Sequence, residues 1–280
     1  MNITIIGVGL IGGSLAMRLK ETNFASAIIG IDNNKENLEK ALQLNIIDSL
    51  SDLEAGVKEA DLIVLAIPVD AIQQLLPNVL DLISKNQVVM EMGSTKQEIL
   101  DSVDRHQNRG RLVACHPMAG TEYSGPEAAL RDLFEGKNMV FCDITRTDED
   151  AFELAESVCE ELQMNPIFMH AKEHDLHAAY VSHISHITSF GLALTVLEKE
   201  KSQGRIFELA SGGFASTVRL AKSSAEMWVP IFKQNREHVL EVLEEHVRQL
   251  KLFHDLLEKE DYPAVLKLIK QANKIKRIIK

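Results

Sequence analysis

In the first half of the chain, short runs of β-branched and other apolar residues alternate with longer segments in which apolar and polar residues are mixed. This alternation is typical of a parallel sheet whose strands are connected by helices, and it predicts an α/β domain with a doubly wound sheet. The expected strands are Ile3–Ile6, Ala27–Ile31, Leu62–Ile67, Val88–Met92, Leu112–Cys115, Met139–Cys142 and Ile167–Met169, and the expected helices between them include Leu10–Lys20, Lys35–Leu42, Val69–Ile83 and Asp148–Leu162.

From Glu173 onward the strand pattern disappears, and the remaining residues are predicted to be helical, with Gly204 and Pro230 among the residues that interrupt the helices. No low-complexity linker separates the two halves, so the all-α part is expected to pack tightly against the α/β part. The sequence predicts one domain over residues 1–171 and a second over 172–280.

A glycine-rich turn follows the first expected strand. Gly7 would permit a tight turn, Gly9 would let a pyrophosphate approach the backbone, and Gly12 would let the following helix pack closely on the strand. The free N–H groups of a helix start can hold phosphates. The turn predicts a Rossmann-type dinucleotide site that includes Leu10 and Ile11, although a glycine turn needed only for packing would have the same sequence.

Asp32 ends the next expected strand, 20 residues after Gly12. A carboxylate at this place can accept hydrogen bonds from ribose hydroxyls and would repel a 2′-phosphate. The following residues, Asn33 and Asn34, provide no positive charge for that phosphate. The sequence therefore predicts NAD rather than NADP as the cofactor.

His116 follows the apolar run Leu112–Cys115 and is followed by Pro117, which interrupts regular structure. Ligands bind at the carboxyl ends of parallel strands, so an imidazole there is a candidate general base. Ser94 follows Val88–Met92 at the same edge and could fix the tautomer of His116. A plain helix N-cap is the alternative for Ser94.

The helical part begins with a histidine-rich segment. On one regular helix, His174 and His183 are nine residues apart, about 2.5 turns, so they and their neighbours would face opposite directions and could not share a metal ion. We therefore predict no metal site. His186 and Ser182 are better suited to lining a polar cleft.

Arg219 lies in a short, mostly apolar segment, and Trp228 is the only tryptophan. An arginine in that setting is either a surface residue or a two-pronged partner for a carboxylate. The sequence alone leaves both open.

Composition limits the partners and the compartment. The formal net charge of −11 disfavours binding to nucleic acid or to anionic membranes. No apolar run approaches the roughly 20 residues that span a bilayer, and no export signal is expected. The three cysteines lie in apolar segments without CxxC spacing, which is typical of a reducing cytoplasm.

Taken together, these residues resemble the prephenate dehydrogenase family of tyrosine biosynthesis. The resemblance covers nearly the whole chain. It departs at Ser216 and Ser185, where family members usually carry Asp and Pro. The matching pieces are Gly7–Gly13, Gly93–Lys96, His116–Glu122, His174–Asp175, Ser182–His186, Gly212–Ala221 and Met227–Trp228.

The resemblance implies NAD-dependent oxidative decarboxylation of prephenate to 4-hydroxyphenylpyruvate by a homodimer that is intertwined through its helical domains. His116 would be the base and Ser94 would orient it. Arg219 would hold a carboxylate, and His186 would contact the pyruvyl side chain. Further substrate-binding residues would be Thr121, Glu122, Ser182, His183 and Trp228.

Three alternatives stay open. An arogenate dehydrogenase would bind a substrate with an amino group, which Glu122 could attract. A 3-hydroxyacid dehydrogenase shares the domain order but relies on a lysine base. A non-catalytic NAD-binding sensor protein would show no turnover.

Overall fold

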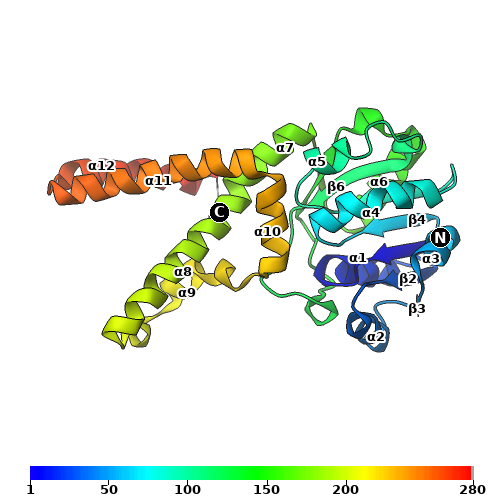
Figure 1. Cartoon of the computed structure of the whole chain (residues 1–280), viewed down its shortest axis with the longest axis horizontal. Coiled ribbons are helices and arrows are strands. Elements are labelled where there is room, and N and C mark those ends of the chain that lie inside the picture. The colour runs from blue at the N-terminus through cyan, green and yellow to red at the C-terminus, as the bar shows by residue number, and fades with distance from the viewer. Residues whose placement is uncertain (279–280) are drawn as a thin grey trace. The chain divides into compact units, whose positions relative to one another are not determined.

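The computed structural model describes residues 1–278 and divides into two compact units, Met1–Arg236 and Glu237–Lys280. The first unit contains one eight-stranded sheet with helices on both faces (Figure 1). Its strands are β1 (Asn2–Ile6), β2 (Ala27–Ile31), β3 (Ser49–Leu50), β4 (Leu62–Leu65), β5 (Val88–Glu91), β6 (Leu112–Pro117), β7 (Asn138–Cys142) and β8 (Asn165–Met169).

Each of the seven strands expected from the sequence is present, and its ends differ from the prediction by two residues at most. The sequence pattern missed β3 and two short helices, because segments of two to seven residues carry too few positions to show a period. The helices around the sheet are α1 (Leu10–Glu21), α2 (Lys35–Gln43), α3 (Leu53–Glu59), α4 (Val69–Leu82), α5 (Gln97–Asp101) and α6 (Glu149–Glu161).

The strand order is β3-β2-β1-β4-β5-β6-β7-β8, the order of a doubly wound Rossmann sheet with two strands added at one edge. The expectation of a wholly parallel sheet is wrong at one place, because β7 runs antiparallel to β6. The connection between them, residues 118–137, contains only a short 3-10 turn instead of the crossover helix that a parallel pair requires. The doubly wound α/β fold itself is confirmed.

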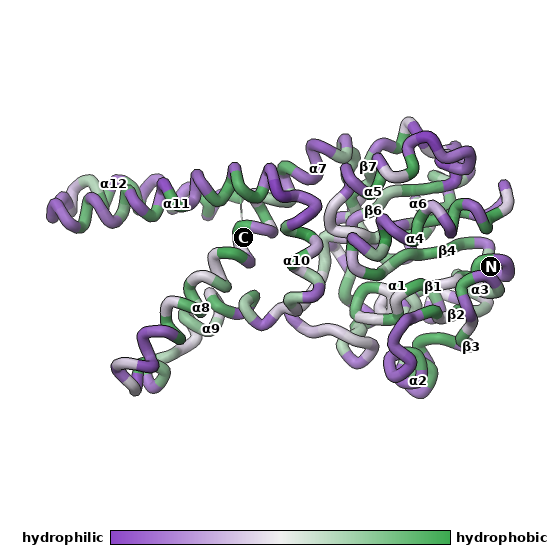
Figure 2. Tube along the Cα trace, in the orientation of Figure 1, coloured by the Kyte–Doolittle hydropathy of each residue, from purple (hydrophilic) through white to green (hydrophobic). Residues whose placement is uncertain are grey.

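The sheet is buried on both faces, so its central strands are mostly apolar (Figure 2). Leu15 of α1 and Ala155 of α6 pack on one face with Ile5 and Met90. Ile72 of α4 packs on the other face, as do residues of α3 and α5. The strands β1, β4, β5 and β6 are therefore fixed side by side, and their carboxyl ends meet at one edge.

The rest of the first unit is helical, and α10 packs against α4 on the sheet domain, with Trp228 and Ile231 in the same buried cluster as Ile72. A π-helical turn, here labelled η4, connects α7 to α8. The elements are α7 (Ala171–Ala178), η4 (Ala179–His183), α8 (Ile184–Gln203), η5 (Ile206–Leu209), α9 (Gly212–Thr217), η6 (Arg219–Lys222) and α10 (Ala225–Gln234).

The second unit contains α11 (Arg236–Glu258) after its first residue, α12 (Tyr262–Ala272) and the short turn η7 (Asn273–Arg277). The side chain of Asp261 caps the start of α12 by accepting a hydrogen bond from the backbone of Ala264. Within residues 1–278, no helix is both long and apolar enough to cross a membrane.

Candidate active site

The glycine turn after β1 could serve packing alone or the binding of a dinucleotide, and the space around each glycine distinguishes the two. Gly7 has φ +96°, and a Cβ there would lie 2.4 Å from the carbonyl oxygen of Ala66. A Cβ on Gly12 would lie 2.0 Å from the oxygen of Gly7, so both glycines are required for packing. A Cβ on Gly9 would meet nothing closer than 3.9 Å. Packing alone does not require a glycine at position 9, whereas a phosphate that approaches the backbone does.

The start of α1 is suited to an anion. Gly9 is its N-cap, no side chain among the described residues caps it, and its first turn, which includes Leu10 and Ile11, holds no acid. By contrast, Asn34 caps α2 with its own side chain. The carboxylate of Asp32 accepts hydrogen bonds from the backbone of Val8 (3.2 Å) and of Asn34 (2.9 Å). Asp32 is thereby fixed beside the glycine turn, where a ribose of a dinucleotide would lie.

His116 lies at the carboxyl end of β6, on the same edge of the sheet as the glycine turn, because β1, β4, β5 and β6 are parallel. The side chain is half-buried. Loss of hydration on burial lowers the pKa of the His116 imidazolium well below its usual range, and positive charge on His174, Lys96 and His183 would lower it further. His116 is therefore neutral near pH 7, as a general base must be.

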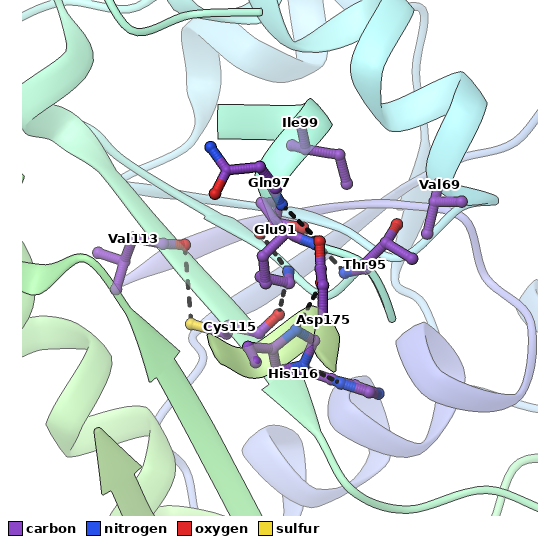
Figure 3. A network of polar contacts seen from close by, with 12 residues as sticks. Val69, Glu91, Thr95, Gln97, Ile99, Val113, Cys115, His116 and Asp175 are labelled. Atoms are coloured by element: carbon purple, nitrogen blue, oxygen red, sulfur yellow. Dashed lines mark hydrogen bonds and ion pairs between the residues drawn. The ribbon is translucent and has the colours of Figure 1, made fainter. Parts of the chain in front are cut away.

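The partner of His116 is not the one that the sequence predicted. Its Nδ1 lies 2.7 Å from Nε2 of His174, and Nδ1 of His174 lies 2.8 Å from a carboxylate oxygen of Asp175. Among residues 1–278, no hydrogen bond joins Ser94 to His116. The start of α7 brings a second imidazole to Nδ1 of His116 instead (Figure 3), and the role of Ser94 as the group that orients His116 stays a prediction.

Behind this pair lies a fully buried ion pair. The ammonium of Lys96 contacts the carboxylate of Glu91 and donates a hydrogen bond to the backbone oxygen of Cys115 (2.6 Å). The second carboxylate oxygen of Glu91 accepts a hydrogen bond from the backbone of Gly93 (2.9 Å). Lys96 thus connects the end of β5 to β6 directly before His116 (Figure 3).

The π-helical turn η4 overturns the expectation that His174 and His183 face opposite directions. A π-turn holds one residue more than an α-turn, so the residues after it are rotated back by about 100° relative to a regular helix. His183 is buried, and its Nδ1 lies 3.2 Å from the side-chain amide of Asn235, which also donates to the backbone oxygen of Asp175 (2.6 Å). Burial lowers the pKa of His183 to about 4, so this imidazole is neutral.

His186 and Trp228 form a stacked pair with ring centroids 3.6 Å apart. Nδ1 of His186 lies 3.1 Å from the backbone oxygen of Ser182, to which it donates, while the hydroxyl of Ser182 is half-buried. The indole Nε1 of Trp228 is buried and has no hydrogen-bond partner among residues 1–278. Burial lowers the pKa of His186, and the charge of Arg219 lowers it further.

Arg219 lies in η6 and forms an ion pair with Glu122, with Nη1 and Oε2 2.7 Å apart. About half of the arginine side chain is exposed (49%), whereas Glu122 is mostly covered (11%). Of the two positions that the sequence left open for Arg219, the exposure corresponds to a surface residue in η6, although its partner is a carboxylate. Glu122 and Thr121 belong to the loop after β6, where the hydroxyl of Thr121 accepts a hydrogen bond from the backbone of Tyr123.

Sequence reasoning assigned no role to several residues that the structure brings to the site. Lys96 and Asp175 are charged residues in buried positions, and their mostly polar sequence neighbours give no sign of that burial. Asp175 and His174 are neighbours in the sequence, so their pairing could have been predicted. The contact of His174 with His116 depends on how α7 packs and could not. The residues missed are Glu91, Lys96, His174, Asp175, Gln234 and Asn235.

A dinucleotide turn and a neutral histidine at one edge of a Rossmann sheet define a dehydrogenase of the oxidoreductase class. The comparisons agree. Residues 15–167 match the family described as prephenate dehydrogenase, nucleotide-binding domain, and residues 170–271 match prephenate dehydrogenase, dimerization domain. The glycine turn lies just before the first match. The chain belongs to the prephenate dehydrogenase family.

Individual relatives are similar over most of their length. The prephenate dehydrogenase of Bacillus subtilis is 32% identical over 273 residues, which cover 96% of this chain and 74% of the relative. The Aquifex aeolicus prephenate dehydrogenase, solved with hydroxyphenyl propionate and NAD⁺, superposes with a TM-score of 0.89 at 31% identity, covering 99% and 97% of the two chains. Synechocystis arogenate dehydrogenase superposes with a TM-score of 0.78 at 25% identity and full coverage.

Proposed function

We propose that this protein catalyses the NAD-dependent oxidative decarboxylation of prephenate to 4-hydroxyphenylpyruvate. The observation that carries the proposal is His116, a neutral imidazole at the same sheet edge as the dinucleotide turn. Family membership and the similarity to relatives named for this activity support the choice of substrate.

The chemistry asks little of the protein beyond positioning and one proton transfer. Bound NAD supplies the acceptor for the hydride from the ring carbon that bears the hydroxyl group. His116 takes the hydroxyl proton, so that a carbonyl forms at that carbon. The bond to the ring carboxylate then breaks, its electrons make the ring aromatic, carbon dioxide leaves, and His116 returns the proton to the phenolic oxygen.

Substrate carboxylates need a cationic partner, and we assign that role to Arg219. A guanidinium binds a carboxylate through two parallel hydrogen bonds. Its present partner, Glu122, is the group that such a carboxylate would displace, so the pair would gate the site. His186 is placed to contact the pyruvyl side chain beside Trp228. Ser94, Thr121, Ser182 and His183 remain proposed lining residues of the same site.

The cofactor is proposed to be NAD, held by Gly7, Gly9, Gly12 and the first turn of α1, with Asp32 on the ribose. Asp32→Ser combined with Asn33→Arg should shift preference toward NADP, because it removes a repulsion and adds a phosphate partner. The ratio of kcat/KM for the two cofactors measures the shift. A native enzyme that already uses both equally would contradict the role of Asp32.

The assembly is proposed to be a homodimer. Large apolar side chains are exposed on α8 and η5, among them Leu194, Leu197 and Leu209, and the matched domain is described as a dimerization domain. We place the boundary between the cofactor domain and this domain at 171/172. The buried, free Cys115, Cys142 and Cys159 are typical of a reducing compartment and support a cytoplasmic location.

The test is the formation of NADH, followed at 340 nm, with prephenate, arogenate and 3-hydroxyacids in parallel. Turnover of prephenate at the highest kcat/KM supports the proposal. Arogenate is the second candidate, since Glu122 could attract its ammonium and an arogenate dehydrogenase is among the similar structures. Turnover of neither ring substrate would overturn the proposal. A 3-hydroxyacid dehydrogenase would then remain if the 3-hydroxyacids are oxidised, and a sensor protein if none of the substrates is.

A further inference from the structure

We propose that Asp175 and His174 are positioning residues that set the tautomer of His116, so that its Nε2 carries the lone pair that accepts the substrate proton. The inference rests on the proposed function for its kinetic consequence, and on geometry alone for the tautomer. The three groups form one chain of short contacts, from Asp175 through His174 to His116.

The direction of each hydrogen bond in this series follows from Asp175, because its carboxylate is held in place by the backbone. Asp175 accepts hydrogen bonds from the backbone N–H of Lys96 (2.8 Å) and of Gln97 (2.9 Å). Both carboxylate oxygens of Asp175 thus already act as acceptors. The hydrogen between Asp175 and His174 therefore belongs to Nδ1 of His174.

The remaining protons are then determined. Burial lowers the pKa of His174, so the ring is neutral and its Nε2 is bare. A bare Nε2 at 2.7 Å from Nδ1 of His116 can only accept, which places the proton of neutral His116 on Nδ1. Nε2 of His116 is left as the basic nitrogen. Without the carboxylate, each ring could adopt either tautomer, and in one of the two His116 is useless as a base.

The chain also helps after proton transfer. When His116 becomes an imidazolium, its Nδ1–H points at a neutral imidazole whose far nitrogen already donates to a carboxylate. Hydrogen bonds to charged groups are stronger than those between neutral groups, so the charged state is stabilised where it forms. The carboxylate is not itself protonated in this scheme.

The tautomer can be measured without any substrate. Nitrogen-15 chemical shifts of histidine side chains distinguish protonated from bare ring nitrogens, and His116→Asn and His174→Gln assign the signals. We expect Nδ1–H and bare Nε2 on both rings in the holoenzyme with NAD. Protonated Nε2 on His116 would overturn the inference, whether or not prephenate proves to be the substrate.

Kinetics separate positioning from packing. His174→Phe fills the space without an acceptor and should lower kcat by about 10²-fold or more, with KM for prephenate changed by less than about 3-fold. His174→Gln keeps an acceptor and should recover at least about 10-fold of that loss. A variant series in which Phe is as active as Gln, or in which only KM changes, would contradict the inference.

Asp175→Asn completes the series. Oδ1 of Asp175 faces both His174 and the backbone N–H of Lys96, so an amide N–H₂ at that position reverses both tautomers, whereas an amide turned the other way keeps them. The activity must follow the nitrogen spectrum: kcat should fall by about 10²–10⁴-fold where the His116 proton has moved to Nε2, and native kcat with that proton on Nε2 would contradict the inference. If that variant does not fold, the pair of His174 variants still decides. His177→Gln is the matched control, because His177 is exposed on the same helix, and its kcat should stay at the native value.

Discussion

The two ends of the proposed site are built in opposite ways. Around His116 most of the polar groups are buried and hydrogen-bonded to one another, and Asp175 alone accepts four hydrogen bonds, counting its backbone oxygen. At Arg219 a single ion pair with Glu122 lies half in solvent. A buried network is costly to disturb, whereas an exposed ion pair is worth about 0–1 kcal/mol.

This difference teaches which group can be exchanged during a catalytic cycle. The base must stay in one orientation through every turnover, and burial with many partners achieves that. The guanidinium must leave one carboxylate for another, and a weak, exposed pair permits it. Substitutions at the two ends should therefore change different quantities, such as kcat or KM, and by different amounts.

The largest expected effect is on chemistry at the buried end. His116→Asn should lower kcat by about 10²–10⁴-fold, because it removes the general base. NAD affinity, measured by fluorescence titration, should be unchanged, since the glycine turn is on β1 and α1. Near-native turnover of this variant would remove His116 from the mechanism.

Next comes the stability of the buried end. Lys96→Met should reduce the free energy of unfolding by about 3–5 kcal/mol, because Glu91 is left buried without its cation. Adding Glu91→Gln should restore much of the loss, as measured by urea denaturation. Lys58→Met is the control, because it breaks the exposed pair with Glu54 and should cost at most about 0.5 kcal/mol. Equal losses of unfolding free energy in Lys96→Met and Lys58→Met would contradict the difference between the buried and the exposed ion pair.

A third effect is on pH dependence. The pKa of His183 falls from about 6.5 unfolded to about 4 folded, so the unfolded state gains a proton first as the pH drops. The stabilisation from neutral His183 is complete above pH 6.5 and lost by pH 4, about 3 kcal/mol in all. Unfolding free energies across this range should fall less steeply in His183→Gln than in the native protein. Parallel curves would show that His183 is not buried as a neutral group.

The smallest effect is expected at the exposed end. Arg219→Ala should raise KM for prephenate by about 10-fold, while the melting temperature hardly changes, because the lost ion pair is exposed. Arg219→Lys should recover only part of the affinity, since an ammonium cannot reproduce the two parallel hydrogen bonds. A fall in stability with an unchanged KM would make Arg219 a structural residue.

The same contrast shows what the sequence could predict. The strands, the glycine turn and His116 depend on local patterns, and the sequence places them within two residues. The contact between His116 and His174 joins residues 58 positions apart and depends on the docking of α7, so no local pattern reports it. The antiparallel β7 was missed for a related reason, because its direction is decided by a connection without a crossover helix.

The error on His183 had a different origin. Counting residues along a regular helix gave the wrong face, because the rotation changes inside η4. Helical periodicity is an average property, and one turn with i→i+5 hydrogen bonds suffices to break it. Sequence reasoning about which side chains share a helix face therefore fails at such turns.

The turn η4 also means that this segment contains one residue more than a regular helix with the same facing would need. Removing one residue between Ala179 and His183 would let the backbone relax to an ordinary helix, which gains regular hydrogen bonds locally. The same deletion would leave His183, His186 and the remainder of α8 on their present face relative to His174, because the shorter regular helix has the register that the π-turn now supplies. A one-residue insertion in a regular stretch of α8 would instead rotate every later residue by about 100°, so this segment tolerates a deletion inside η4 better than an insertion after it.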